Sequence, residues 1–190
     1  MVGSVPILRQ TCDFGTGASP RNGWDLPLRA DLRRSRGLQF HFRCADTTPV
    51  SYFAVYLQSG NGWYRFEFTP RGNGRWETIL LEKRDSQVEG TPAGWGRIEC
   101  LRVSAWRRSS GKTAFDCAAF TARPATGAIL VVRGLGNAGL PAAETKAAVR
   151  HAADIDRLLA DHGIGATLVE EPDVDSALLA GAPARYLLSR

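Results

Sequence analysis

The sequence has no long apolar run and few of the residues that usually build catalytic or metal centres. Its 190 residues include three histidines, four cysteines and one methionine. No apolar run approaches the ~20 residues that a membrane-spanning helix needs. The N-terminus has no basic flank followed by an apolar core, so no signal peptide is predicted. No catalytic constellation is recognisable. These absences argue against a membrane protein, make an enzyme the less favoured reading and leave the compartment open.

The cysteines do not have the spacing of a zinc site. They lie far apart, with no CxxC pair, at Cys12, Cys44, Cys100 and Cys117. Because each lies in or beside an apolar strand pattern, buried free thiols are predicted; one or two disulfides are the alternative for an exported protein. No pattern predicts a cofactor or a metal ion. The alternative is a structural calcium ion, for which Asp13, Asp46 and Glu89 are loop-borne acids.

The net charge of +5 is unevenly distributed along the chain. Residues 1–125 hold 18 Lys/Arg and 11 Asp/Glu, whereas residues 126–190 hold 6 and 8. This break predicts two domains, 1–124 and 125–190. Arginine clusters at 33–36 and 107–112 could contact phosphate backbones. Since no nucleic-acid motif accompanies them, we interpret them as solvated loop charges and expect no nucleic-acid partner.

The first domain reads as about eight short strands separated by turns, with no amphipathic helix. Alternation places Leu38, Phe40 and Phe42 on one face of their strand. Ser59-Gly-Asn-Gly62 is a hairpin signal. This pattern predicts a mainly β domain, an antiparallel β-sandwich of the jelly-roll type. The expected strands are 5–12, 24–32, 37–44, 51–58, 63–69, 76–83, 97–106 and 113–121.

The stretch 89–106 combines a glycine-rich loop with the most regular strand of the chain. The loop runs through Gly96 and contains Trp95. In the strand that follows, Leu101, Val103 and Ala105 point one way, and Arg102, Ser104 and Trp106 point the other. A strand of this kind belongs to a sheet with one core face and one face that can hold a polar ligand.

After residue 127 the pattern changes to that of an α/β tail. Residues 128–133 are continuously apolar, as in a buried parallel strand. A helix is expected from about Pro141 to Gly163, followed by strand 166–169, a short helix 173–180 and strand 185–188. The tail is thus a partial flavodoxin-like β-α-β-α-β unit. We expect such a short unit to dock, to pair with another chain or to be part of a larger domain.

Two family resemblances follow from these motifs. Ser59-Gly-Asn-Gly-Trp-Tyr64, Trp76, the loop 89–96 and Leu-Arg-Val-Ser-Ala-Trp106 resemble the galactose-binding-like β-sandwich modules of bacterial glycan-active proteins. Residues 127–190 are similar to the opening of the glutamine-amidotransferase-like domain of some β-galactosidases, where it mediates trimer formation. The second resemblance implies a homo-oligomer. It implies no activity, since the nucleophilic cysteine of amidotransferases lies beyond the third strand, where this sequence ends.

The candidate carbohydrate-binding residues share the non-core phase of their strands. Sugars need aromatic platforms and planar hydrogen-bonding groups, and the residues that offer them here are Gln39, His41, Tyr52, Tyr56, Arg65, Arg102 and Trp106. Three aromatics beside glycine-rich turns could form a rim: Trp63, Tyr64 and Trp95. The alternative is that all of these side chains serve packing, and phase alone does not say which sheet is concave.

The tail contains one nucleotide-binding pattern. Gly134-Leu-Gly-Asn-Ala-Gly139 is a GxGxxG between a strand and a helix, where backbone amides can hold a pyrophosphate. The acid expected about 20 residues later is displaced, because Glu170 and Glu171 follow some 31 residues after the last glycine. We therefore favour a non-catalytic carbohydrate-binding module. The alternative is a structural or oligomerisation part of a larger glycoside hydrolase; a nucleotide-dependent enzyme is third.

Overall fold

The structure, a computed structural model, describes residues 6–15, 19–72, 74–125, 128–133, 142–170 and 185–189. The chain divides into two units, one of Met1–Leu32 and Gly37–Arg123, the other of Arg33–Arg36 and Pro124–Arg190. The change of unit after Arg123 lies next to the boundary expected from the charge break. The assignment of Arg33–Arg36 to the second unit has no counterpart in the sequence pattern.

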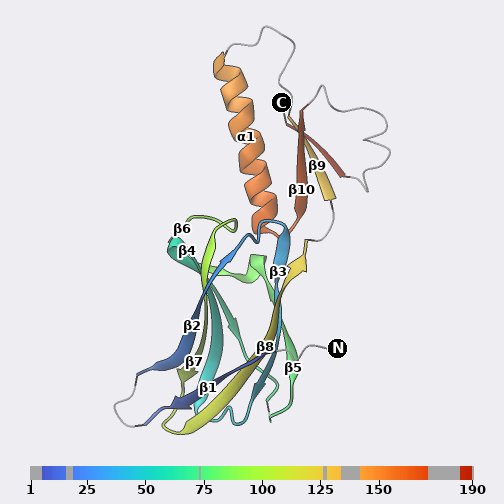
Figure 1. The fold of residues 1–190 in the computed structure, drawn as a ribbon. Coiled ribbons are helices and arrows are strands. Elements are labelled where there is room, and N and C mark those ends of the chain that lie inside the picture. Colours follow the sequence, from blue (N-terminus) through green and yellow to red (C-terminus); the bar gives the residue numbers. More distant parts are fainter. Residues whose placement is uncertain are drawn as a thin grey trace. The chain divides into compact units, whose positions relative to one another are not determined.

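The first unit is a β-sandwich of two antiparallel sheets (Figure 1). Sheet A has the strand order β1-β8-β3-β5, and sheet B has the order β2-β7-β4-β6. Successive strands β1 to β4 alternate between the sheets, as the predicted jelly roll requires. The elements are β1 (Ile7–Asp13), β2 (Arg21–Ala30), β3 (Ser35–Cys44), β4 (Val50–Phe68), β5 (Glu77–Glu82), the 3-10 turn η1 (Lys83–Asp85), β6 (Gln87–Pro92), β7 (Ile98–Arg107) and β8 (Lys112–Pro124).

The β4 segment is one continuous run that folds back on itself. Residues 50–58 pair with β7, whereas residues 60–65 pair with β6. Phe53 and Phe68 have ring centroids only 5.7 Å apart, so the two halves lie side by side. Gly60 at the bend has a φ of +56°, a conformation that favours glycine. The predicted hairpin at residues 59–62 is therefore confirmed.

The β6 strand was expected to be part of a loop. Residues 87–92 instead pair antiparallel with β4, and Gly62 lies opposite Gly90. A Cβ on Gly90 would come within 2.6 Å of the Asn61 carbonyl oxygen, so the backbones approach too closely for a side chain. Turn-forming residues at this edge reflect a close strand contact, which a loop assignment from composition misses.

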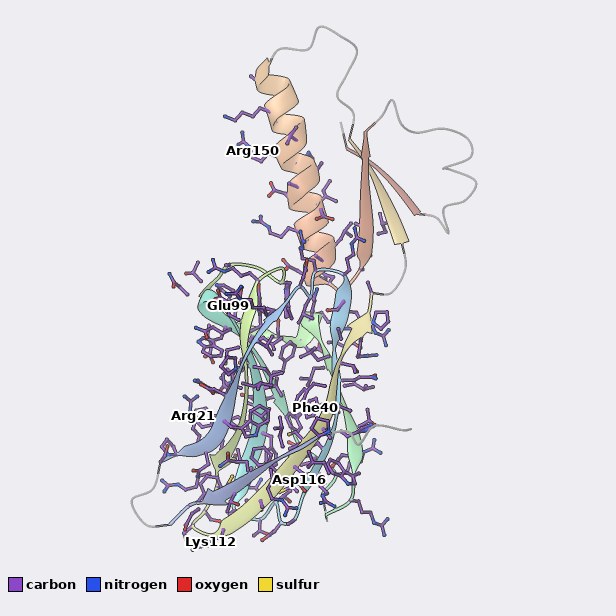
Figure 2. All side chains as sticks on the ribbon, viewed as in Figure 1. Arg21, Phe40, Glu99, Lys112, Asp116 and Arg150 are labelled. Carbon is purple, nitrogen blue, oxygen red and sulfur yellow. The ribbon has the colours of Figure 1, made fainter. Side chains whose placement is uncertain are left out.

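Phenylalanine rings fill the space between the sheets. Phe42 is fully buried and contacts Phe40, Phe53, Phe68 and Phe115, with ring centroids 4.8–6.3 Å apart. Figure 2 labels the neighbouring Phe40 between the two sheets. Because aromatic side chains bury large apolar areas, this cluster dominates the core.

A positive φ of 55° at Ala119 changes the facing of β8. Phe115 and Cys117 are buried in the core as predicted. Unbroken alternation would place Ala119 on the same inward face. Instead the next residue, Phe120, packs on the core and stacks on Phe40 at 4.6 Å. A left-handed residue of this kind shifts the alternation by one.

The outer face of sheet A is held by a buried carboxylate. Asp116 is 3% exposed. It accepts two hydrogen bonds from Arg9, at 2.7 and 3.0 Å, and one from Arg43 Nε at 2.7 Å. The Arg9 guanidinium, followed by that of Arg43, holds the pKa of Asp116 below its usual value. Asp116 thus ties β8 to its neighbours β1 and β3.

The second unit contains a parallel sheet and a long helix. Its strands run in the order β10-β9-β11, and both outer strands are parallel to β9. The elements are β9 (Ala128–Arg133), α1 (Ala142–Asp161), β10 (Gly165–Glu170) and β11 (Arg185–Ser189). The three parallel strands and the first helix match the predicted tail. The expected helix 173–180 lies outside the described residues, and the flavodoxin-like assignment stays a prediction.

Gly163 ends α1 in the left-handed conformation, with a φ of +70°. The amides of Gly163 and Ile164 donate to the carbonyls of Ala160 and Leu159, at 3.0 and 2.9 Å. On the helix itself Ala152 is buried, whereas Val149 is 39% exposed. None of the helices in the described residues has the length and apolarity to cross a membrane.

All four cysteines are buried free thiols, as the sequence favours. Cys12, Cys44 and Cys117 belong to strands of sheet A, and Cys100 belongs to β7 of sheet B. Burial raises the pKa of the Cys12 thiol to about 12 and also raises that of Cys117.

Replacing the buried carboxylate should weaken the sandwich. Asp116→Asn leaves two guanidinium groups without their charged partner, so we expect the free energy of unfolding to fall by about 1–3 kcal/mol. Denaturant unfolding measures this loss. Asp85→Asn is the control, because Asp85 is exposed and 3.9 Å from Arg84; it should change stability by less than about 0.5 kcal/mol.

The contribution of Asp116 to stability should depend on pH. Its pKa is depressed in the fold, so this contribution to the free energy of unfolding is present at neutral pH. It is lost as the pH falls below about 4, and the two proteins should converge in acid. An equal deficit at low and neutral pH would contradict this role.

Alanine at Gly163 should destabilise the end of α1. Its Cβ would lie 2.2 Å from Arg36 Cα, in a backbone conformation that already disfavours alanine. We expect a loss of at least about 1 kcal/mol, measured as earlier thermal melting of the helical circular dichroism signal. Gly74→Ala, with a positive φ but no atom within 4 Å, is the control for backbone strain without the close contact and should lower the helical melting temperature less. Unchanged helical melting in Gly163→Ala would contradict the close approach of Gly163 and Arg36.

Candidate functional site

The outer face of sheet B is a lattice of three rows across β2, β7 and β4. The strand register places Arg21 beside Trp106 and Trp106 beside Tyr52 in the first row. Gly23, Ser104 and Ala54 form the second row, and Asp25, Arg102 and Tyr56 form the third. Small residues thus separate two rows of large aromatic and charged side chains. We call this lattice, together with Trp63 and Arg65 of β4, the aromatic-arginine face.

The Arg65 guanidinium lies at the centre of the aromatic groups. Its carbon is 5.7 Å from the ring centroid of Tyr52 and 6.0 Å from those of Tyr56 and Trp106. Arg65 Nη2 donates to the Tyr52 hydroxyl at 3.1 Å. Burial raises the pKa of Tyr52, so its hydroxyl keeps a proton that it can donate. Arg65 also pairs with Glu67, and more loosely with Glu89 at 3.4 Å.

Arg102 organises the third row. It donates two hydrogen bonds to Asp25, at 2.6 and 2.7 Å, and lies 4.6 Å from the Trp63 ring centroid. The hydrogen bond from Arg102 lowers the pKa of Asp25, and the Arg21 charge adds to this effect. This bidentate pair fixes the orientation of the Arg102 guanidinium, and both partners remain partly exposed.

The two large aromatics of the first row form a platform. Tyr52 and Trp106 are stacked, with centroids 5.5 Å apart and planes 21° apart. The Arg21 guanidinium lies over this end of the face, 5.5 Å from the Trp106 centroid and 5.9 Å from that of Tyr56. Figure 2 labels Arg21 on β2, the strand at the edge of sheet B.

Buried polar atoms without partners concentrate on this face. In the part of the chain that the structure describes, four buried side-chain nitrogen or oxygen atoms have no hydrogen-bond partner. Three of them belong to the aromatic-arginine face: Arg65 Nε, Ser104 Oγ and Trp106 Nε1. Since buried polar groups are normally satisfied, this cluster is unusual and indicates that the face has unused hydrogen-bonding capacity.

The structure brings together most, but not all, of the predicted residues. Tyr52, Tyr56, Arg65, Arg102 and Trp106 lie on one face, with Trp63 beside them. Tyr56 is only 3% exposed, so it supports the face from within. Gln39 and His41 do not join this group: they belong to β3 of sheet A, where His41 Nδ1 lies 3.2 Å from Thr78 Oγ1.

The other two rim aromatics are part of the core. Tyr64 and Trp95 stack with centroids 3.8 Å apart and are 7% and 4% exposed. Lys83 Nζ covers the Trp95 ring at 4.8 Å, and the Trp95 carbonyl accepts a hydrogen bond from the Leu32 amide. These two aromatics pack in the core of the sandwich and are too buried to stack on a ligand.

The three loop acids considered for a structural calcium ion each contact another group, and the calcium alternative stays a prediction. Asp13 pairs with Lys112, Asp46 accepts from the Thr48 amide, and Glu89 contacts Arg65. Within the described ranges, no three His, Cys, Asp or Glu side chains are grouped to hold a metal ion. The glycine loop 134–139 and Glu171 lie outside these ranges, so the nucleotide hypothesis stays a prediction.

Sequence reasoning missed Arg21, Asp25 and the row of small residues. Pro27 and Gly23 interrupt the alternation of β2, so its outward phase could not be read from the sequence. The row itself exists only through pairing between strands that are distant in the chain. Pairing of β2 with β7 would have been enough to suggest Asp25 as the ion-pair partner of Arg102.

Comparisons with known proteins give distant structural likeness only. No family model matches the sequence, and no curated protein matches it. The chain is similar to the family 11 carbohydrate-binding module from Clostridium thermocellum in complex with a β-1,3-1,4-mixed-linked tetrasaccharide. Identity is 11%, the TM-score is 0.37, and the match covers 61% of this chain and 96% of the module. It is also similar to dimeric latent PorU from Porphyromonas gingivalis, at 12% identity and a TM-score of 0.23, over 62% of this chain and 13% of PorU.

Likeness at this level carries no inference about the ligand, and the function proposed below rests on the geometry of the aromatic-arginine face. The resemblance of the tail to an amidotransferase-like domain, with the oligomer that it implies, stays a prediction.

Two substitutions in the row of small residues should differ in their effect on the free energy of unfolding. A Cβ on Gly23 would lie 2.4 Å from the Val103 carbonyl oxygen, so Gly23→Ala should lower the free energy of unfolding by about 1–3 kcal/mol. Ser104→Ala removes an unpartnered buried hydroxyl and should be neutral or slightly stabilising. Denaturant titration of both variants measures this. A large loss in Ser104→Ala would mean that the hydroxyl already has a partner.

Proposed function

We propose that the protein is a non-catalytic carbohydrate-binding module whose ligand lies on the aromatic-arginine face. The observation that carries the proposal is the coincidence of stacked aromatics with hydroxyl and partly exposed guanidinium groups on one face. A sugar ring has apolar C–H faces and a rim of hydroxyl groups. It is therefore a ligand that can contact aromatic rings and planar hydrogen-bonding groups together.

The proposed binding mode uses the first row as the platform. A sugar ring stacks on Trp106 and Tyr52, and one of its hydroxyls receives a hydrogen bond from the Tyr52 hydroxyl. Arg65 stiffens the platform by holding the Tyr52 hydroxyl. Since these atoms are prearranged by the strand register, little ordering is needed on binding.

The third row provides a second contact zone. Its residues lie four positions along each strand from the first row, about 13 Å at the usual strand rise. Trp63 and Arg102 offer a ring and guanidinium donors there. The face thus suits an oligosaccharide better than a single sugar.

Binding should depend on the platform residues and not on exposed aromatics in general. We expect Trp106→Ala to weaken glycan binding at least tenfold, the loss typical of a central aromatic contact. The measurement is a glycan array screen followed by titration calorimetry on the best ligand. Tyr52→Phe should weaken binding less, because the ring remains and only the hydroxyl is lost.

The matched control is Trp76→Ala. Trp76 is 41% exposed and lies 4.8 Å under the Arg43 guanidinium, next to the outer face of sheet A. The Trp76→Ala variant should bind glycan with the same affinity as the unmodified protein. Equal losses in Trp76→Ala and Trp106→Ala would place the ligand elsewhere, and no binding to any glycan would overturn the proposal.

A further inference from the structure

We propose that the ligand of the aromatic-arginine face is an acidic glycan, one that contains uronic acid, and that Arg21 recognises its carboxylate. This inference rests on the proposed function and narrows it to a chemical class. It follows from the difference between Arg21 and the other two arginines of the face.

Arg65 and Arg102 already have carboxylate partners. Arg65 pairs with Glu67 and Glu89, and Arg102 makes a bidentate pair with Asp25. Their charges are locally compensated, so their remaining donors suit neutral hydroxyl groups. Neither needs an anionic ligand.

Arg21 has no such partner. Among the described residues, no carboxylate lies within ion-pair distance of its guanidinium, and its neighbours there are the rings of Trp106 and Tyr56. Asp25 acts on it only at longer range and is itself bound to Arg102. Arg21 therefore brings one uncompensated positive charge to the edge of the platform.

The position of Arg21 fits a carboxylate attached to a stacked sugar ring. Arg21 is in the same row as Trp106 and Tyr52, and its guanidinium lies 5.5 Å from the Trp106 ring centroid, so it can contact a sugar ring that binds at this end of the face. A guanidinium binds a carboxylate through two parallel hydrogen bonds, which fixes orientation as well as affinity. A neutral ring would leave this charge covered and unpaired, which is costly.

The experiment compares acidic polysaccharides with their own neutral counterparts. Polygalacturonate, alginate and hyaluronate are each tested by affinity electrophoresis beside the carboxyl-reduced form, which keeps the ring and loses the charge. We expect at least one acidic form to bind at least tenfold more tightly than its reduced form. We also expect Arg21→Gln to weaken binding of the acidic form and so to remove that preference.

Controls separate recognition from general attraction to a basic protein. Arg75→Gln removes one positive charge from the loop before β5 and should leave the preference intact. Polyglutamate is a polyanion without sugar rings and should not compete. Equal effects of Arg21→Gln and Arg75→Gln, or competition by polyglutamate, would overturn the inference.

The failures of the two proposals are distinguishable. If neutral glycans bind through Trp106 but no acidic form is preferred, the carbohydrate-binding function stands and the acidic ligand is wrong. If Arg21→Gln leaves binding of the acidic form unchanged, Arg21 does not recognise the carboxylate. If no glycan of either kind binds, both proposals fall.

Discussion

The alternation of side chains along each strand is the constraint on which the sandwich and its candidate site both depend. Once Phe53, Val55 and Leu57 are buried in the core, the intervening residues of β4 must point outward. The same holds for β7, where burial of Val103 and Ala105 fixes the direction of Ser104 and its neighbours. The aromatic-arginine face is thus the reverse side of the phenylalanine core, and packing of one face positions the other.

This constraint explains how far the sequence could predict the site. Outward phase correctly grouped Tyr52, Arg65 and Trp106, because β4 and β7 are regular and adjacent. The same reasoning placed His41 in the group, yet β3 belongs to the opposite sheet. Phase tells which residues avoid the core, and both sheets of a sandwich have an outer face. Only the pairing of strands tells them apart.

Other features depended on contacts that no local pattern encodes. The backbone of β6 approaches β4 so closely that glycine is required at Gly90, and this composition imitates a loop. The left-handed residue Ala119 shifts the facing of β8 without a glycine to mark it. Arg21 and Asp25 were missed because β2 has an interrupted alternation, and its partners on β7 lie some 80 positions further along the chain. The parallel arrangement of the tail was predictable, since a continuous apolar run is typical of a strand buried on both faces of a parallel sheet.

The buried thiols give the two sheets separate chemical reporters. A thiol reacts as the thiolate, and burial raises the pKa of the Cys12 thiol to about 12. Alkylation of Cys12 therefore requires local opening of its strand. Cys12, Cys44 and Cys117 sample sheet A, whereas Cys100 of β7 has the same outward phase as Arg102 and samples sheet B next to the aromatic-arginine rows. The rate of labelling at each cysteine therefore measures local opening. A ligand seated on sheet B would slow labelling at Cys100 more than at the other three.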